Sequence, residues 1–295
     1  MALKKPPADT RAPAIKVARF AGFCSGVTIA VKKTKKLLLH KKVYCIGDLV
    51  HNSFVMSDLA KKGLIIVKKP TAIPENSDVI IRAHGLPLKT IKNLKKKNCR
   101  IFDFTCPILK KIHLTLEKLK KADYSIIIIG NPLHAEVKAL ISHAGRNSVI
   151  VENKAAAENF KPQPARSPKK KKTAVICQST ITDSRFLEIS GVLGGKIPGA
   201  RIINTICREA KERRVEAKEL AKISKMVIIV GDRKSSNTVN LAKIVRRICP
   251  AEIITGVNDL RGKKFRDPIG ITSGASSPRE LVLEIEKCVY KKVVR

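Results

Sequence analysis

The chain of 295 residues has no tryptophan, and aromatic residues make up only 4% of it. Because proteins usually hold unpaired bases by stacking them on aromatic side chains, this scarcity argues against a sequence-specific nucleic-acid-binding protein. Acidic residues are also few, with 24 Asp and Glu against 60 Lys and Arg, a net charge of +36. The basic residues are spread along the whole chain, as on a solvated surface that attracts small anions and acidic protein partners.

Long apolar runs are absent as well. No stretch approaches the roughly 20 apolar residues that a bilayer-spanning helix needs. Residues 1–14 lack the apolar core of a signal peptide, and we expect them to form a disordered tail. The sequence therefore predicts a cytoplasmic protein with no membrane partner.

The apolar residues that are present lie in short, strand-like runs that alternate with basic segments of helical character, such as 210–224. The runs cover residues 15–20, 43–46, 64–67, 78–82, 100–104, 124–129, 148–151, 173–177, 200–204, 226–230, 251–255 and 269–272. This alternation predicts an α/β fold of mostly parallel sheets with helices on their faces. We expect about four strands in each of three similar lobes.

Three cysteines, Cys24, Cys106 and Cys207, occupy equivalent places about 80 to 100 residues apart. Each follows an apolar run and precedes a basic helical segment, so each is expected at the carboxyl end of a strand, where open α/β sheets bind ligands. The pattern predicts three lobes that each deliver one thiolate to a shared centre. Their expected bounds are 15–105, 106–205, with an exposed Lys- and Pro-rich loop at 161–172, and 206–295.

Two further sets of residues share this period. His84, Ser179 and Ser276 each come just after a strand-like run. The other set is a glycine turn after a strand, which appears as Gly47, Asp48 and His51, as Gly130, Asn131 and His134, and as Gly231, Asp232 and Ser235. One such match is ordinary loop chemistry, but three sets with a common period indicate a repeated lobe rather than unrelated units.

The eight cysteines include no local C-x-x-C pair, which argues against an ordinary structural zinc site. Three thiolates can still bind one zinc ion with its fourth position open, or three irons of a 4Fe–4S cluster with the fourth iron free. Wide spacing favours the cluster, and the residues alone leave both open. The remaining cysteines lie in or beside apolar segments and are interpreted as core residues: Cys45, Cys99, Cys177, Cys249 and Cys288.

Histidine, serine and asparagine side chains are predicted to surround the same centre. They are His51, His84, His134, Ser235, Ser236, Asn237 and Ser276. Helix N-termini with such donors bind anions, and a set without an arginine clamp fits a diphosphate held by neutral hydrogen bonds, although each serine can equally be a helix N-cap. Glu136, close to His134, is a candidate proton donor. His40, His113 and His143 are expected on the surface or on helix faces.

Nine short motifs, GFCSGV, VHNSFV, AHG, DFTCP, LHAEV, QST, NTIC, SSN and SGAS, occur in the order and spacing of one known family. Over residues 18–281 the chain resembles the 4-hydroxy-3-methylbut-2-enyl diphosphate reductases. The resemblance implies three lobes in pseudo-threefold symmetry around a central cavity. It also implies one 4Fe–4S cluster ligated by Cys24, Cys106 and Cys207, with an open fourth iron.

The implied reaction is the reductive dehydroxylation of (E)-4-hydroxy-3-methylbut-2-enyl diphosphate to isopentenyl and dimethylallyl diphosphate, the last step of the methylerythritol phosphate pathway. Ferredoxin or flavodoxin would donate the electrons. The residues at the family's diphosphate-binding positions are His51, His84, Ser235, Ser236, Asn237 and Ser276. His134, Glu136 and Ser179 would bind substrate or relay protons, and Ser179 replaces the family's usual threonine. The alternatives are a zinc hydrolase with three cysteine ligands and a basic RNA-binding protein.

Overall fold

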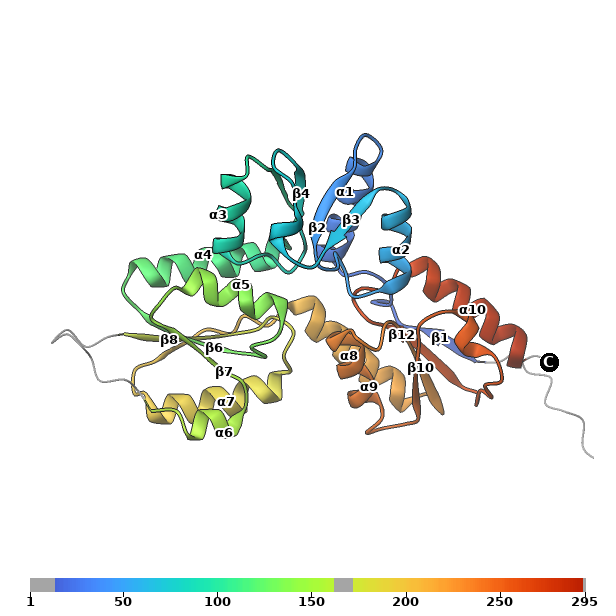
Figure 1. Ribbon diagram of the computed structural model, residues 1–295. Coiled ribbons are helices and arrows are strands. Elements are labelled where there is room, and N and C mark those ends of the chain that lie inside the picture. The colour runs from blue at the N-terminus through green and yellow to red at the C-terminus, as the bar shows by residue number, and fades with distance from the viewer. Residues whose placement is uncertain (1–13, 162–171, 294–295) are drawn as a thin grey trace, which may run out of the picture. The chain divides into compact units, whose positions relative to one another are not determined.

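The computed structural model describes residues 14–161 and 172–293 (Figure 1). The expected N-terminal tail, apart from Ala14, and most of the expected loop at 161–172 lie outside these ranges. Within them, twelve strands form three parallel sheets of four strands each, and helices flank the sheets. The α/β fold predicted from the sequence is confirmed.

The first sheet has the strand order β3-β2-β4-β5. Its strands are β2 (Val43–Ile46), β3 (Leu64–Val67), β4 (Asp78–Ile81) and β5 (Arg100–Asp103). The helices among these strands are α1 (Ser25–Leu38), α2 (Ser53–Lys61), the short 3₁₀ helix η1 (Pro70–Ala72) and α3 (Leu88–Lys96). Because β2 and β4 are neighbours in a parallel sheet, the loops after them begin at the same sheet edge.

The second sheet has the order β7-β6-β8-β9. Its strands are β6 (Ser125–Ile129), β7 (Ser148–Val151), β8 (Thr173–Cys177) and β9 (Arg201–Ile202), with helices α4 (Pro107–Lys121), α5 (Ala135–Ala144), α6 (Lys154–Glu158) and α7 (Asp183–Lys196). Helices α4 and α5 cover one face, and α6 and α7 cover the other (Figure 1). The unbroken SIIII run of β6 follows from this burial on both faces.

The third sheet has the order β1-β12-β10-β11. Its strands are β1 (Ile15–Val17), β10 (Met226–Val230), β11 (Ala251–Ile254) and β12 (Ile269–Ser273), with helices α8 (Arg208–Lys222), α9 (Ser236–Val245), η2 (Val257–Leu260) and α10 (Arg279–Val293). We expected residues 15–20 to open the first lobe. That expectation is wrong for β1, which pairs with β12 because its two apolar residues pack against the core of the third sheet.

The chain divides into two compact units. The described residues from 24 to 212 form one unit, which holds the first two sheets, while the described residues before 24 and after 212 form the other, which holds the third. The lobe boundaries near residues 105 and 205, the pseudo-threefold symmetry and the central cavity stay predictions. In the described ranges, no helix combines the length and the apolar character required to cross a bilayer.

Candidate functional site

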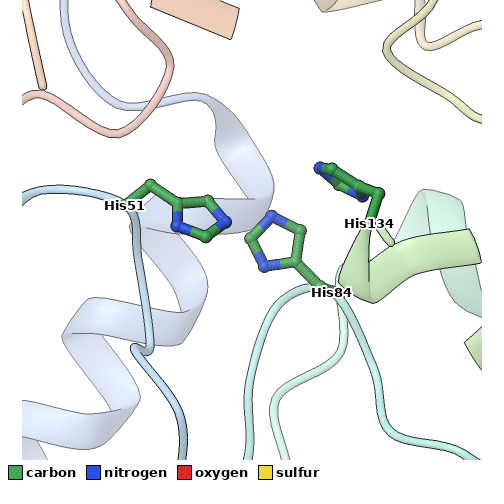
Figure 2. A group of neighbouring side chains, drawn as sticks. All are labelled: His51, His84 and His134. Carbon is green, nitrogen blue, oxygen red and sulfur yellow. The ribbon is translucent and has the colours of Figure 1, made fainter. Parts of the chain in front are cut away.

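Three histidines converge in the unit of residues 24–212. His51 and His84 lie in the loops after the neighbouring strands β2 and β4, and His134 is the N-cap of α5, which follows β6. Figure 2 shows the three imidazoles gathered together from these separate segments. The ring centroids lie 5.1 Å apart for His51 and His84, 5.6 Å for His84 and His134, and 6.5 Å for His51 and His134. The structure therefore brings these three sequence-predicted residues together.

Two of the three imidazoles, those of His84 and His134, are kept uncharged. Burial, together with electrostatic repulsion from His51 and Arg82, lowers the pKa of His134 to about 4. Burial also lowers the pKa of His84 well below its usual value, with the same repulsion from neighbouring rings and from Arg82. The backbone N–H of Glu136 donates a hydrogen bond of 3.2 Å to His134 Nδ1. Neutral His134 must therefore carry its proton on Nε2, where it can donate to a ligand.

Arg82 is a neighbour of this cluster that the sequence interpretation missed. Its side chain is partly buried, and Nη1 donates to the carbonyl oxygen of Asp48, in the loop that carries His51, over 3.3 Å. We had expected an anion site without an arginine, but a permanent positive charge stands beside the histidines. The available signal was a charged residue at the end of the apolar run VIIRAHG, directly before the His84 turn.

Glu136 and Ser179 form a buried hydrogen-bonded pair. Glu136 is 1% exposed, and its Oε1 accepts from the backbone N–H of Ser179 at 2.6 Å. Its Oε2 accepts from Ser179 Oγ at 3.0 Å. Burial raises the pKa of Glu136 to about 7, against the opposing effect of the two hydrogen bonds. A carboxyl group that is half-protonated near neutral pH can act as a general acid.

The three sequence-predicted cysteines stand at helix N-termini. Cys24 is the N-cap of α1, Cys106 is the N-cap of α4, and Cys207 directly precedes α8. In each case the cysteine carbonyl accepts the first backbone hydrogen bond of the helix. The partial positive charge of a helix N-terminus stabilises a thiolate. For Cys106, burial raises the pKa of the thiol, while the backbone N–H groups of Leu109 and Ile108 lower it.

Contacts between their segments draw the three cysteines together. The helix of Cys24 packs so closely on Cys106 that a Cβ added at Gly26 would lie 2.6 Å from Cys106 Sγ. Cys106 and Cys207 are near enough for their charges to interact, and Glu136 also acts on Cys106. The backbone N–H of Cys207 donates to the carbonyl oxygen of Ser179 at 2.8 Å. The buried acid and the thiols therefore share one neighbourhood.

A further contact joins the first and last of these segments. The residue after Cys24, Ser25, donates to Glu209 Oε2 from its backbone N–H at 2.9 Å and from its hydroxyl at 3.1 Å. Glu209 lies two residues after Cys207, in the first turn of α8. Glu209 is a positioning residue that the sequence interpretation did not identify.

The predicted serine and asparagine positions belong to the other unit and lie at the carboxyl ends of two neighbouring strands. Ser236 begins α9, directly after the N-cap Ser235, whose Oγ accepts from the backbone N–H of Thr238 at 3.5 Å. Ser276 follows β12, the strand that pairs with β10. Among the described residues, Asn237 Nδ2 is buried and has no hydrogen-bond partner. A helix N-terminus with an unsatisfied amide donor suits an anion.

His113 and His143 were expected on the surface or on helix faces; they lie on faces of α4 and α5, but these faces are buried. Both are only 8% exposed, and their rings stack with centroids 4.0 Å apart and planes inclined by 12°. His143 Nδ1 lies 3.1 Å from Glu117 Oε1, and a Cβ at Gly85, next to His84, would lie 3.1 Å from His113 Cε1. Their amphipathic helices α4 and α5 face each other, which buries both rings. His40 is exposed, as expected.

Comparison with known proteins identifies relatives over nearly the whole chain. The LytB protein family matches residues 15–290. The curated 4-hydroxy-3-methylbut-2-enyl diphosphate reductase of Clostridioides difficile is 33% identical over 276 residues, which cover 92% of this chain and 97% of the relative. That of Dictyoglomus thermophilum is 32% identical over 267 residues, 90% of this chain and 92% of the relative.

The chain belongs to the LytB protein family.

Solved structures give the same result for the LytB fold. The E-1-hydroxy-2-methyl-but-2-enyl-4-diphosphate reductase of Plasmodium falciparum superposes with a TM-score of 0.85 and 27% identity, covering 94% of this chain and 88% of that one. A structure described as (E)-4-hydroxy-3-methyl-but-2-enyl diphosphate reductase, the terminal enzyme of the non-mevalonate pathway, superposes with a TM-score of 0.71. The LytB chain is an oxidoreductase, and its family depends on iron and sulfur.

The donor set of this LytB chain fits an iron–sulfur cluster. Cys24, Cys106 and Cys207 form no disulfide bond, and each is partly exposed and stands at a helix N-terminus. In the described residues, the histidine cluster is the only set of three or more His, Cys, Asp or Glu groups close enough to bind one metal ion. The three cysteines lie in one neighbourhood, as thiolate ligands of one inorganic core do.

Proposed function

We propose that the chain reduces (E)-4-hydroxy-3-methylbut-2-enyl diphosphate to isopentenyl and dimethylallyl diphosphate, the last step of the non-mevalonate isoprenoid pathway. The names of its relatives support this assignment. The observation that carries it is the buried Glu136, whose pKa is raised to about 7 and which neighbours Cys106. A proton donor beside thiol ligands is what reductive removal of a hydroxyl group requires.

The cofactor in this proposal is one 4Fe–4S cluster held by Cys24, Cys106 and Cys207, with one iron free of protein ligands. When bound, the cluster would supply electrons and a Lewis-acidic iron. All three cysteines stand at helix N-termini, whose partial positive charge suits anionic ligand atoms. The contacts of Gly26 with Cys106 and of Ser25 with Glu209 hold the ligand segments against one another.

The reaction consumes two electrons and two protons, breaks a C–O bond and releases water. Glu136 is proposed to give the proton that converts the departing hydroxyl into water, because its carboxyl is protonated in about half of the molecules near pH 7. Ser179 donates a hydrogen bond to each carboxyl oxygen of Glu136 and so fixes the orientation of the group that transfers the proton. His134 is proposed to bind substrate through Nε2–H and to take part in the proton relay. The allylic product can then accept its second proton at either end.

The diphosphate is proposed to bind to histidine and serine donors that hold its charge by hydrogen bonds. The residues assigned to it are His51, His84, Ser235, Ser236, Asn237 and Ser276. The lowered pKa values of His84 and His134 mean that these rings act as neutral donors. Fixing the diphosphate orients the short carbon chain, which turns binding energy into positioning of the reacting end.

The electron donor is proposed to be ferredoxin or flavodoxin, small acidic carriers that suit a partner with a net charge of +36. A cytoplasmic location is part of the same proposal, since free thiols and an oxidisable cluster suit a reducing compartment. We propose no membrane partner and no specific nucleic acid.

The test is anaerobic turnover of the cluster-loaded protein with a viologen reductant and the allylic alcohol diphosphate. Chromatography should detect both isopentenyl and dimethylallyl diphosphate. The proposal fails if protein with a full complement of iron leaves the substrate unchanged, or if it yields an alcohol and free diphosphate by hydrolysis.

A further inference from the structure

The histidine cluster has the geometry of a metal site. One ligand nitrogen each from His51, His84 and His134 lies within 4.8 Å of the others. Three neutral imidazoles are a common ligand set for zinc and other divalent transition-metal ions. The same three rings can equally donate hydrogen bonds to an anion. The imidazoles alone therefore do not decide whether the preferred ligand is a cation or an anion.

A guanidinium group beside the cluster is held in a fixed position. Arg82 Nη1 donates to the carbonyl oxygen of Asp48 at 3.3 Å, and a Cβ added at Gly47 would lie 2.8 Å from the same nitrogen. Both contacts are with the loop that leads to His51. Arg82 Nε is buried and has no hydrogen-bond partner among the described residues. The side chain is thus packed against one histidine loop and lies two residues before His84 in the other.

The charge of Arg82 is not cancelled locally. In the described part of the chain no ion pair to Arg82 forms, and the Asp48 carboxylate attracts the guanidinium without pairing with it. Burial raises the pKa of the nearby Cys45 thiol to about 12, so this neighbour is uncharged. An arginine keeps its proton at any pH at which the protein is folded. The cluster therefore faces a permanent, largely unpaired positive charge.

We propose that Arg82 determines the ligand specificity of the His51–His84–His134 cluster, making it an anion site for the diphosphate and excluding the divalent metal ions that three histidines otherwise bind. The guanidinium attracts a diphosphate and repels a divalent cation through the same Coulomb interaction, which a partly desolvated site screens only weakly. Burial is the main cause of the lowered pKa of His84 and of His134, and repulsion by Arg82 acts in the same direction. The identity of the natural anion rests on the proposed function, but the preference for negative charge does not.

The test compares Arg82→Gln with Arg82→Lys in cluster-loaded protein under anaerobic conditions. Inorganic diphosphate and Zn²⁺ are titrated separately by calorimetry, with iron content checked before and after. Glutamine can still donate to Asp48 but carries no charge, whereas lysine keeps the charge. Arg82→Gln should bind diphosphate at least tenfold more weakly and Zn²⁺ at least tenfold more tightly than wild type. Arg82→Lys should stay within a few-fold of wild type for both probes.

A second substitution assigns the zinc to the cluster. Adding His84→Asn to Arg82→Gln should abolish the gained zinc affinity. A purely structural role for Arg82 would weaken diphosphate binding without creating a zinc site, and that result would overturn the proposal. Wild-type protein gives an independent check if Arg82→Gln does not fold. Tight Zn²⁺ binding to wild type that His84→Asn removes would also overturn it. Since both probes are inorganic, these results stand whether or not the chain turns over the allylic substrate.

Discussion

Glu136 shows how single residues determine the chemistry of this site. A carboxyl group that is 1% exposed would be protonated far above neutral pH if burial acted alone. The two hydrogen bonds from Ser179 favour the carboxylate and oppose that shift, so the pKa of Glu136 is raised only to about 7. The pair therefore holds a proton that is both present and transferable at neutral pH.

Replacing Glu136 by glutamine tests the proton role. Glutamine keeps the size and can keep accepting from Ser179, so iron content and KM for the allylic diphosphate should change little. Loss of the transferable proton should lower kcat by about 100-fold or more. Glu158→Gln at the exposed end of α6 is the matched control and should have no effect. Full activity of Glu136→Gln would rule out the proton role.

Ser179 makes the pH dependence testable. Turnover needs protonated Glu136, so kcat should fall as pH rises through about 7. Ser179→Ala removes one hydrogen bond to the carboxylate, which should raise the pKa of Glu136 and move the fall to higher pH, while Ser179→Thr should leave it in place. An unchanged profile in Ser179→Ala would contradict this account.

The same raised pKa has a consequence for folding. The stabilising effect of the protonated Glu136 carboxyl is complete below its unfolded pKa of 4.5 and is lost as pH rises through about 7. A rise of this size corresponds to about 3 kcal/mol of unfolding free energy once the group ionises. The site thus retains a proton donor at the expense of stability at neutral and alkaline pH.

At the scale of the elements, close packing of α1 on the start of α4 brings the cysteine segments together. Gly26 lies in the first turn of α1, and only the absence of a side chain there allows the approach to Cys106. Its backbone has no left-handed conformation, so glycine is needed here for space rather than for flexibility.

Gly26→Ala should therefore lower bound iron strongly, because the added Cβ would lie 2.6 Å from Cys106 Sγ. Helix propensity favours alanine over glycine, so a loss cannot come from a weaker α1. Gly191→Ala in α7 is the matched control, since its Cβ would meet nothing within 4 Å, and it should leave iron unchanged. Wild-type iron content in Gly26→Ala would show that this approach is not required for cluster binding.

At the scale of the whole molecule, the net charge of +36 bears on electron delivery. If an acidic protein donor docks on this surface, raising the ionic strength from 0.05 to 0.5 M in the assay should lower kcat/KM for that donor several-fold, because salt screens exposed charges. A small cationic viologen should show no such loss. Equal salt dependence for both reductants would mean that the charge does not steer the donor.

The sequence predicted the sheets well and the packing between elements less well. Short apolar runs such as 43–46 and 226–230 coincide with β2 and β10 because buried parallel strands are apolar on both faces. The pairing of β1 with β12 could not be predicted, since it joins residues some 250 positions apart. The pairing depends on which hydrophobic core Ile15 and Val17 pack against, and the local sequence pattern does not contain that information.

The sequence likewise predicted some residues of the candidate site and missed others. Repeated strand-turn motifs identified His51, His84 and His134, which the structure brings together. Arg82 was missed because it is a single arginine within an apolar run and belongs to none of the repeated motifs. The burial of His113 was missed because an amphipathic helix does not reveal which helix covers its edge.

The central claim is that three thiols distant in sequence hold one inorganic core, and iron and acid-labile sulfide per chain after anaerobic purification test it most directly. Wild type should contain about four of each. Cys106→Ser should lose most of both, while Cys288→Ser, outside the proposed site in α10, should retain them. Zinc in place of iron in wild type, or iron and sulfide unaffected by Cys106→Ser, would contradict the account.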